Sequence, residues 1–97
     1  MKLRSPSLET CVTNAEGHQW RFIGRNAWAL LKLIERGPRG VTPIDTPAPR
    51  WSAYVHNLRR EGIDIETVWE AHKGAFPGCH ARYILRSNLS IVDQKAA

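Results

Sequence analysis

The fold is decided by the stretch from residue 50 to residue 67, which reads RWSAYVHNLRREGIDIET. Apolar side chains recur in its first part at the spacing of one helix face, namely Trp51, Tyr54, Val55 and Leu58. This pattern predicts a helix over residues 48–61 that Gly62 ends. Pro47 and Pro49 fit the first turn of such a helix, where missing N–H groups cost little.

A β-hairpin is expected directly after this helix. Residues 63–70 alternate as a strand does, with Ile63, Ile65, Thr67 and Trp69 on one face. Residues 71–80 contain Gly74, Pro77 and Gly78 and are expected to form a loop. Residues 81–86 are the predicted return strand, with Ala81, Tyr83 and Leu85 on one side and Arg82, Ile84 and Arg86 on the other.

Three further elements are predicted upstream. Residues 9–23 read as a hairpin that turns at residues 14–17, because Trp20 and Phe22 alternate with polar residues. A helix over residues 25–36 has Ala27, Leu30, Leu31 and Ile34 on one face and stops at Gly37. Residues 42–45 begin a second helix, with Thr42 as the cap and Asp45 returning the bond, but Pro47 and Pro49 limit it to about one turn.

These elements predict one α+β domain. Three helices followed by a two-stranded hairpin is the topology of a winged helix-turn-helix, here with an additional N-terminal hairpin. The domain is expected over residues 9–86, after a loose tail over residues 1–8. Residues 87–97 are expected to form a C-terminal tail that frays.

Three segments also carry a family resemblance. Residues 49–62, PRWSAYVHNLRREG, with IET at 65–67, look like a recognition helix entering a wing. Residues 76–83, FPGCHARY, look like the wing turning back. From GRNAWAL at 24–30 to ARYIL at 81–85, about two-thirds of its length, the chain resembles the small stand-alone winged-helix proteins of bacteria and their phages. The resemblance implies the fold and DNA binding, and it implies no particular target.

The composition points to a small basic globular protein. The 97 residues suffice for one domain, and 42% hydrophobic residues allow a packed core. Fourteen Lys and Arg against nine Asp and Glu give a net charge of +5, and ten of the fourteen are arginine. Because guanidinium groups bind phosphate and guanine with two parallel hydrogen bonds, this excess favours nucleic acid, without separating DNA from RNA.

The exposed face of the helix at 48–61 is the predicted reader of DNA. In a helix-turn-helix the second helix lies in the major groove. Asn57 can pair with adenine, and Arg50 or Arg60 with guanine. Ser52 suits a phosphate or a base, and Ala53 can touch a thymine methyl group. The predicted set is Arg50, Ser52, Ala53, His56, Asn57 and Arg60, with Arg59 flanking it, and the alternative is an ordinary solvated helix face.

Cations on the predicted wing are expected to contact the DNA backbone or the minor-groove edge. They are His72, Lys73, His80 and Arg82. An ordinary solvated loop is the competing interpretation. Arg25, Lys32, Arg36 and Arg39 can add phosphate contacts, although a solvated face of the first helix is the preferred interpretation for the first three.

Enzyme and metal chemistry find no support in the sequence. The side chains of Cys79 and His80 would point to opposite sides of a strand, and no pair of cysteines or histidines has structural zinc spacing. No carboxylate pair, phosphate loop or nucleophile elbow occurs, so we expect neither catalysis nor a cofactor. Cys11 and Cys79 are expected to be free thiols. No apolar run could span a membrane and residues 1–6 carry no secretion signal, so a cytoplasmic protein is expected.

Three functions therefore remain open. The leading one is a DNA-binding module, either a transcriptional regulator or a phage accessory factor. The second is a protein-interaction winged helix, with another protein or a second copy as its partner, and the third is RNA binding. The four tryptophans are expected to pack the core. An exposed aromatic side chain at Trp69 or Phe76 would instead favour a protein partner.

Overall fold

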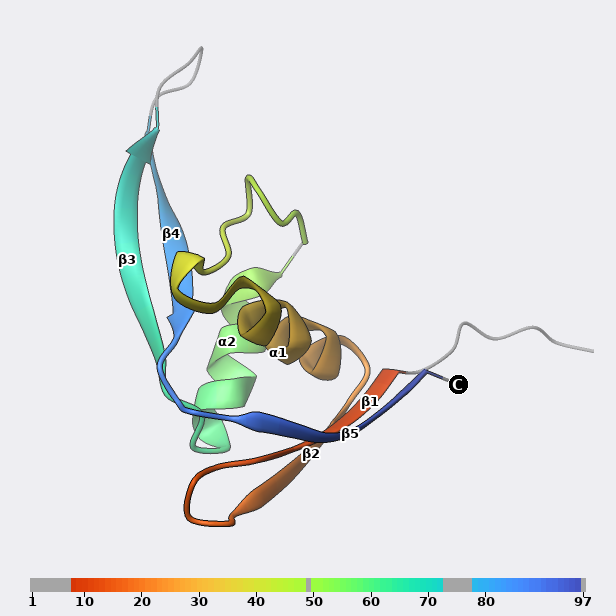
Figure 1. Ribbon diagram of the computed structural model, residues 1–97. Helices are drawn as coiled ribbons and strands as arrows, with labels where there is room; N and C mark the ends of the chain where they lie inside the picture. The colour runs from red at the N-terminus through yellow and green to blue at the C-terminus, as the bar shows by residue number, and fades with distance from the viewer. Residues whose placement is uncertain (1–7, 49, 73–77, 97) are drawn as a thin grey trace, which may run out of the picture.

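The computed structural model describes residues 8–48, 50–72 and 78–96. Two α-helices lie between a three-stranded sheet and a two-stranded hairpin (Figure 1). In chain order the elements are β1 (Leu8–Thr13), β2 (Gln19–Ile23), α1 (Arg25–Arg36), the 3₁₀-helix η1 (Gly37–Arg39), α2 (Trp51–Arg60), β3 (Ile65–His72), β4 (Gly78–Leu85) and β5 (Ser90–Ala96).

The N-terminal hairpin is confirmed. Strands β1 and β2 pair antiparallel, and the side-chain oxygen of Asn14 accepts hydrogen bonds from the backbone N–H groups of Glu16 and His18 in the turn. Gly17 takes the positive φ of 87° that this turn requires. Trp20 and Phe22 share the face turned toward the helices, half-buried and buried respectively.

The expectation of loose tails is wrong at two places. Leu8 already belongs to β1, and residues 90–96 form β5 instead of fraying. Strand β5 pairs antiparallel with β1, giving the sheet order β2-β1-β5. The hydroxyl of Thr10 donates to the carbonyl of Asp93 at 3.1 Å, which ties the C-terminal strand to the first one. The folded unit is therefore longer than the predicted 9–86.

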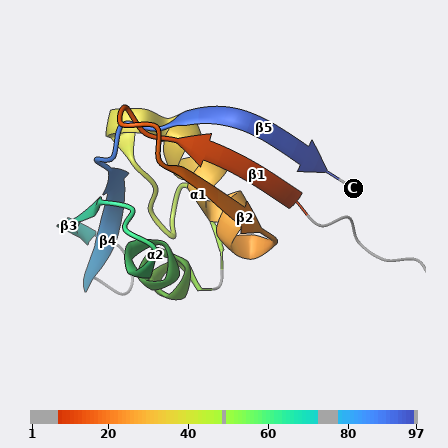
Figure 2. The same cartoon turned by 90° about the horizontal axis from the view of Figure 1, so that it is seen from below.

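Helix α1 has the predicted bounds and ends at Gly37. Its buried face is Ala27, Ala29, Leu30 and Leu33, whereas Leu31 and Ile34 are only half-buried. Helix α1 contacts α2, both strands of the N-terminal hairpin and β4, so it lies at the centre of the molecule (Figure 2).

Helix α2 begins at Trp51, three residues later than predicted. A residue before a proline is disfavoured in the helical region, and Ala48 precedes Pro49. Arg50, the residue before the helix, has a non-helical φ of −144°. Pro47 therefore lies ahead of the helix and not in its first turn, and Pro49 lies outside the described residues.

The short helix expected between these two is a turn, so the described residues hold two α-helices where three were predicted. The predicted reciprocal bonds are present: the Thr42 hydroxyl accepts from the N–H groups of Ile44 and Asp45, and the Asp45 carboxylate accepts from the Thr42 N–H. One backbone bond, from Thr46 N to Thr42 O at 2.9 Å, closes the turn. Pro47 follows at once and prevents a second turn.

The C-terminal hairpin is longer than predicted. Strands β3 and β4 pair from Ile65↔Leu85 to His72↔Gly78, so much of the expected loop over 71–80 is strand. Val41, which follows η1 and Gly40, pairs with Tyr83 of β4 through two backbone hydrogen bonds of 2.9 Å. This bridge attaches one end of the hairpin to the helices.

Candidate nucleic-acid interface

Helix α2 has the predicted register. Trp51, Val55 and Leu58 are buried, while Ser52, His56 and Arg60 are exposed and Ala53 and Asn57 are half-exposed. The polar residues predicted to read DNA therefore lie together on the outer face of the helix, with Arg50 exposed directly before its first turn.

The side chains on this face are available to a ligand. Within residues 8–48, 50–72 and 78–96, no hydrogen bond or ion pair engages the side chains of Arg50, Ser52, His56 or Arg60. Arg59 is different, because its guanidinium donates to the Ile65 carbonyl at 2.6 Å and to the Thr67 hydroxyl at 2.8 Å. Arg59 thus anchors β3 to α2 and does not belong to the free face.

A hollow of about 360 Å³ borders the N-terminal end of α2. Arg50 and Ser52 line it from the helix side, and Trp69 and His80 line it from the hairpin. The structure therefore brings one predicted hairpin residue, His80, to the same depression as two predicted helix residues.

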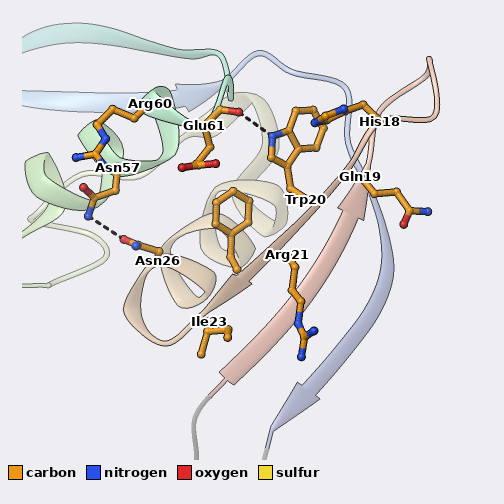
Figure 3. A pocket seen from close by; sticks show the side chains of 10 residues that line it. His18, Gln19, Trp20, Arg21, Ile23, Asn26, Asn57, Arg60 and Glu61 are labelled. Atoms are coloured by element: carbon orange, nitrogen blue, oxygen red, sulfur yellow. Dashed lines mark hydrogen bonds between the residues drawn. The ribbon is translucent and has the colours of Figure 1, made fainter.

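A second hollow, of about 700 Å³, borders the C-terminal end of α2 and separates it from β2 (Figure 3). Asn57 donates to the side-chain oxygen of Asn26 on α1 at 3.3 Å, and the indole N–H of Trp20 donates to the Glu61 carbonyl at 2.7 Å. The rest of the lining is mainly polar. It consists of polar His18, Gln19, Arg21 and Arg60 and apolar Phe22 and Ile23. The contribution of β2 was not predictable from the sequence, because only the packing of distant elements brings this strand beside α2.

Arg82 is held in an ion-pair network. Its guanidinium donates to the Glu70 carboxylate at 2.6 Å and to the Arg39 carbonyl at 2.6 Å, and lies 3.5 Å from Asp45. The hydrogen bond from Arg82 is the main cause that lowers the pKa of Glu70, and the bond to Glu70 likewise raises the pKa of Arg82. His80 bonds the same carboxylate at 3.1 Å. This geometry supports a role for Arg82 in holding the hairpin in place, in contrast to the predicted contact with DNA.

The cations of α1 also have local partners, in keeping with the preferred interpretation of that face. Arg36 donates to the Gly40 carbonyl at 2.8 Å and pairs with Asp45 at 3.0 Å. Lys32 lies 3.8 Å from Glu35. Arg25 donates to the Tyr54 hydroxyl at 3.2 Å and lies over the Trp28 ring at 4.6 Å. Lys73 and Phe76 fall outside the described residues, and the structure does not describe the His72 side chain.

Trp69 contradicts the expectation that all four tryptophans pack the core, because it is 71% exposed. Trp51 is buried, and Trp20 and Trp28 are half-buried against the core. Trp69 does share one strand face with Ile65 and Thr67, as predicted, but the hairpin extends beyond the helices at its far end (Figure 1).

Metal ligands do not gather in the described ranges: no group of three or more His, Cys, Asp or Glu residues there could hold an ion. Cys11 and Cys79 are both free thiols.

Comparison with known proteins decides the family. A family model described as a winged helix domain matches residues 19–95, most of the chain. The chain belongs to this winged helix domain family. In this winged helix domain the hairpin β3–β4, which follows α2, corresponds to the wing. Searches of curated proteins and of solved structures found no match. Among the described residues, no helix is long and apolar enough to cross a membrane.

Proposed function

We propose that this winged helix domain binds duplex DNA, with α2 in the major groove and the wing against the backbone, and that it catalyses no reaction. The observation that supports this most is the outer face of α2, where Arg50, Ser52, His56 and Arg60 are exposed and free of partners within the described residues. The opposite face of α2 is buried in the core, which fixes the rotation of the helix about its axis and keeps these polar side chains on the surface.

The surroundings of α2 suit a duplex. A major groove is about 12 Å wide and admits one helix, and phosphate backbones border it on both sides. The two hollows beside α2 provide room for those backbones, one next to the wing and one next to β2. Arg50 lines the first hollow and Arg60 the second, so a free guanidinium is available on each side.

Such a module suits a transcriptional regulator or a phage accessory factor, acting in the cytoplasm of a bacterium. Positioning by phosphates and reading of base edges both have candidate groups, since the outer face of α2 carries arginines and the amide of Asn57, which also donates to Asn26.

The direct test is a binding titration of the full chain with random-sequence duplex DNA at several salt concentrations. Each neutralised phosphate contributes about −0.9 to the slope of log K against log salt, so two to four contacts give a slope of roughly −2 to −4. The double variant Arg50→Gln/Arg60→Gln should lower the steepness by about two. A folded protein that binds no duplex even at low salt contradicts the proposal.

A protein partner is the second candidate, and the exposure of Trp69 is the observation that favours it. Large exposed aromatic side chains are enriched at protein interfaces. In that case the same titration shows no duplex binding, and the Trp69→Ala variant loses the partner without loss of fold.

A further inference from the structure

Trp69 is exposed on the face of the wing that looks toward the helices. Residues two apart on a strand share a face, so Trp69 lies on the same face as Ile65 and Thr67. Ile65 is buried, Thr67 is half-buried and Trp69 is 71% exposed. The exposure of this face increases along β3, because the wing projects beyond the first turn of α2 (Figure 1). Trp69 therefore faces the hollow beside Arg50 and not the outer solvent side of the wing.

The hollow beside Trp69 has an apolar floor and a polar rim. Ala81 is the cross-strand neighbour of Trp69, and its small buried side chain leaves room beside the indole. Tyr83 and Trp51 continue the floor, with ring centroids 6.5 Å apart. Arg50 and Ser52 line the hollow as well and supply hydrogen-bonding groups. His80 also borders the hollow, but its ring bonds Glu70 on the opposite face of the hairpin from Trp69.

This combination matches the chemistry of a nucleotide. An indole face stacks on any base, whereas an arginine and a hydroxyl bind phosphate. A volume of about 360 Å³ lies in the range of sites for small planar ligands. A base inside a duplex is already stacked on both sides, so the indole can stack only on a base that has left the helix or never belonged to it.

We infer that the hollow between α2 and the wing binds one nucleotide with an unstacked base, the base against Trp69 and the phosphate on Arg50 and Ser52. The inference rests on the proposed DNA binding and extends it: the preferred ligand is a duplex that continues into a single-stranded end. The same chemistry is present in a free mononucleotide, so the experiment must separate the two sources.

The test compares three probes on the full chain: a blunt duplex, the same duplex with a single-stranded overhang, and deoxyadenosine monophosphate. Stacking of one base on an aromatic side chain corresponds to a gain of roughly 5- to 150-fold. We expect the overhang to strengthen binding by such a factor. Trp69→Ala should bring the ratio of overhang to blunt-duplex affinity down to about one, while Trp69→Phe should retain most of the gain.

The matched control is Ile44→Ala, which removes another exposed apolar side chain, 61% exposed, that does not line the hollow. It should keep the full gain from the overhang. A different result assigns the same site to a free nucleotide. In that case the mononucleotide binds, Trp69→Ala abolishes its binding, and the overhang gives no gain.

Failure of this inference and failure of the proposed function give different results. If blunt duplex binds but Trp69→Ala changes no probe, the inference is wrong, the proposed function stands, and the exposure of Trp69 is left to a protein partner. If no duplex binds at low salt, the proposed function itself fails.

Discussion

At the scale of single residues, Trp51 joins more parts of the molecule than its helical position predicts. Its ring is 3% exposed and lies 5.4 Å from the Trp28 ring of α1 and 6.5 Å from the Tyr83 ring of the wing. Its indole N–H donates to the Thr46 carbonyl at 2.6 Å, so the turn before α2 is attached as well. The Trp51 side chain of α2 thus contacts α1, the turn and the wing. It reaches all three because a large ring fills the centre of a small core.

Trp51→Ala should lower the free energy of unfolding by roughly 3–5 kcal/mol, since it leaves a large cavity and an unpaired Thr46 carbonyl. That is a large part of the stability of a domain of this size. Thermal and denaturant unfolding measure the loss. Trp69→Ala is the matched control, with an expected change of about 0.5 kcal/mol or less at an exposed position. Similar midpoints for wild type and Trp51→Ala would show that the ring is not part of the core.

Gly40 is the second position where one residue decides the packing. Its φ is +68°, and a Cβ atom there would lie 2.5 Å from the backbone oxygen of Tyr83 and 2.8 Å from the Ile84 side chain. Gly37 also has a positive φ, of 55°, but a Cβ atom there would meet open space. The two glycines therefore separate backbone strain from steric conflict.

Gly40→Ala should destabilise the protein by roughly 2–5 kcal/mol, the sum of strain at positive φ and overpacking against β4. Gly37→Ala should cost only the strain, about 1–2 kcal/mol. Urea unfolding of both variants gives the comparison. Equal losses would mean that the approach of η1 to β4 is looser than the structure shows.

At the scale of elements, local patterns predict what local interactions determine. The first hairpin, α1 and the buried face of α2 are all readable from periodicity and glycine positions. Strand β5 is not, because its partner β1 lies some 80 residues away along the chain, as the bond between Thr10 and Asp93 shows. The same reason applies to the candidate site. The exposure of α2 was predictable, but the partners of Arg82 and the position of β2 depend on contacts between distant segments.

The attachment of the wing is a second element-scale feature. Arg82 of β4 lies between Glu70 on β3 and Asp45 in the turn, and Asp45 also pairs with Arg36 of α1. Burial alone would raise the pKa of Asp45, but hydrogen bonds from Thr42 and Thr46 and the charge of Arg36 lower it overall. A carboxylate whose pKa is lowered by folding stabilises the folded state above its unfolded pKa. That contribution is lost as the pH falls through the folded pKa.

Asp45→Asn should therefore lower the thermal midpoint at neutral pH. The difference from wild type should shrink as the pH falls below the ordinary aspartate pKa of about 3.9 and through the lowered pKa of Asp45 in the folded state. Thermal melts from about pH 7 down to about pH 2 follow the change. A difference that stays constant down to the lowest pH would mean that the Asp45 charge does not stabilise the fold.

At the scale of the whole molecule, the candidate functional surface of the described residues is the exposed polar face of α2. The wing borders that surface on one side and β2 on the other, each across a hollow. Under the proposed DNA binding, different parts of this surface would position the domain and read the sequence: arginines near the hollows would bind the phosphates, and the middle of α2 would contact base edges.

Asn57 is the residue that tests this division. An asparagine amide can bond adenine through two atoms, so Asn57→Ala should cost roughly 1–3 kcal/mol at the preferred sequence and little on other duplexes. The preferred sequence comes first from random-site selection. Asn26→Ala is the matched control, because it removes the same 3.3 Å bond between the two amides but leaves Asn57 in place. If both variants lose the same affinity on every duplex, Asn57 acts by bracing α2 against α1 and reads no base.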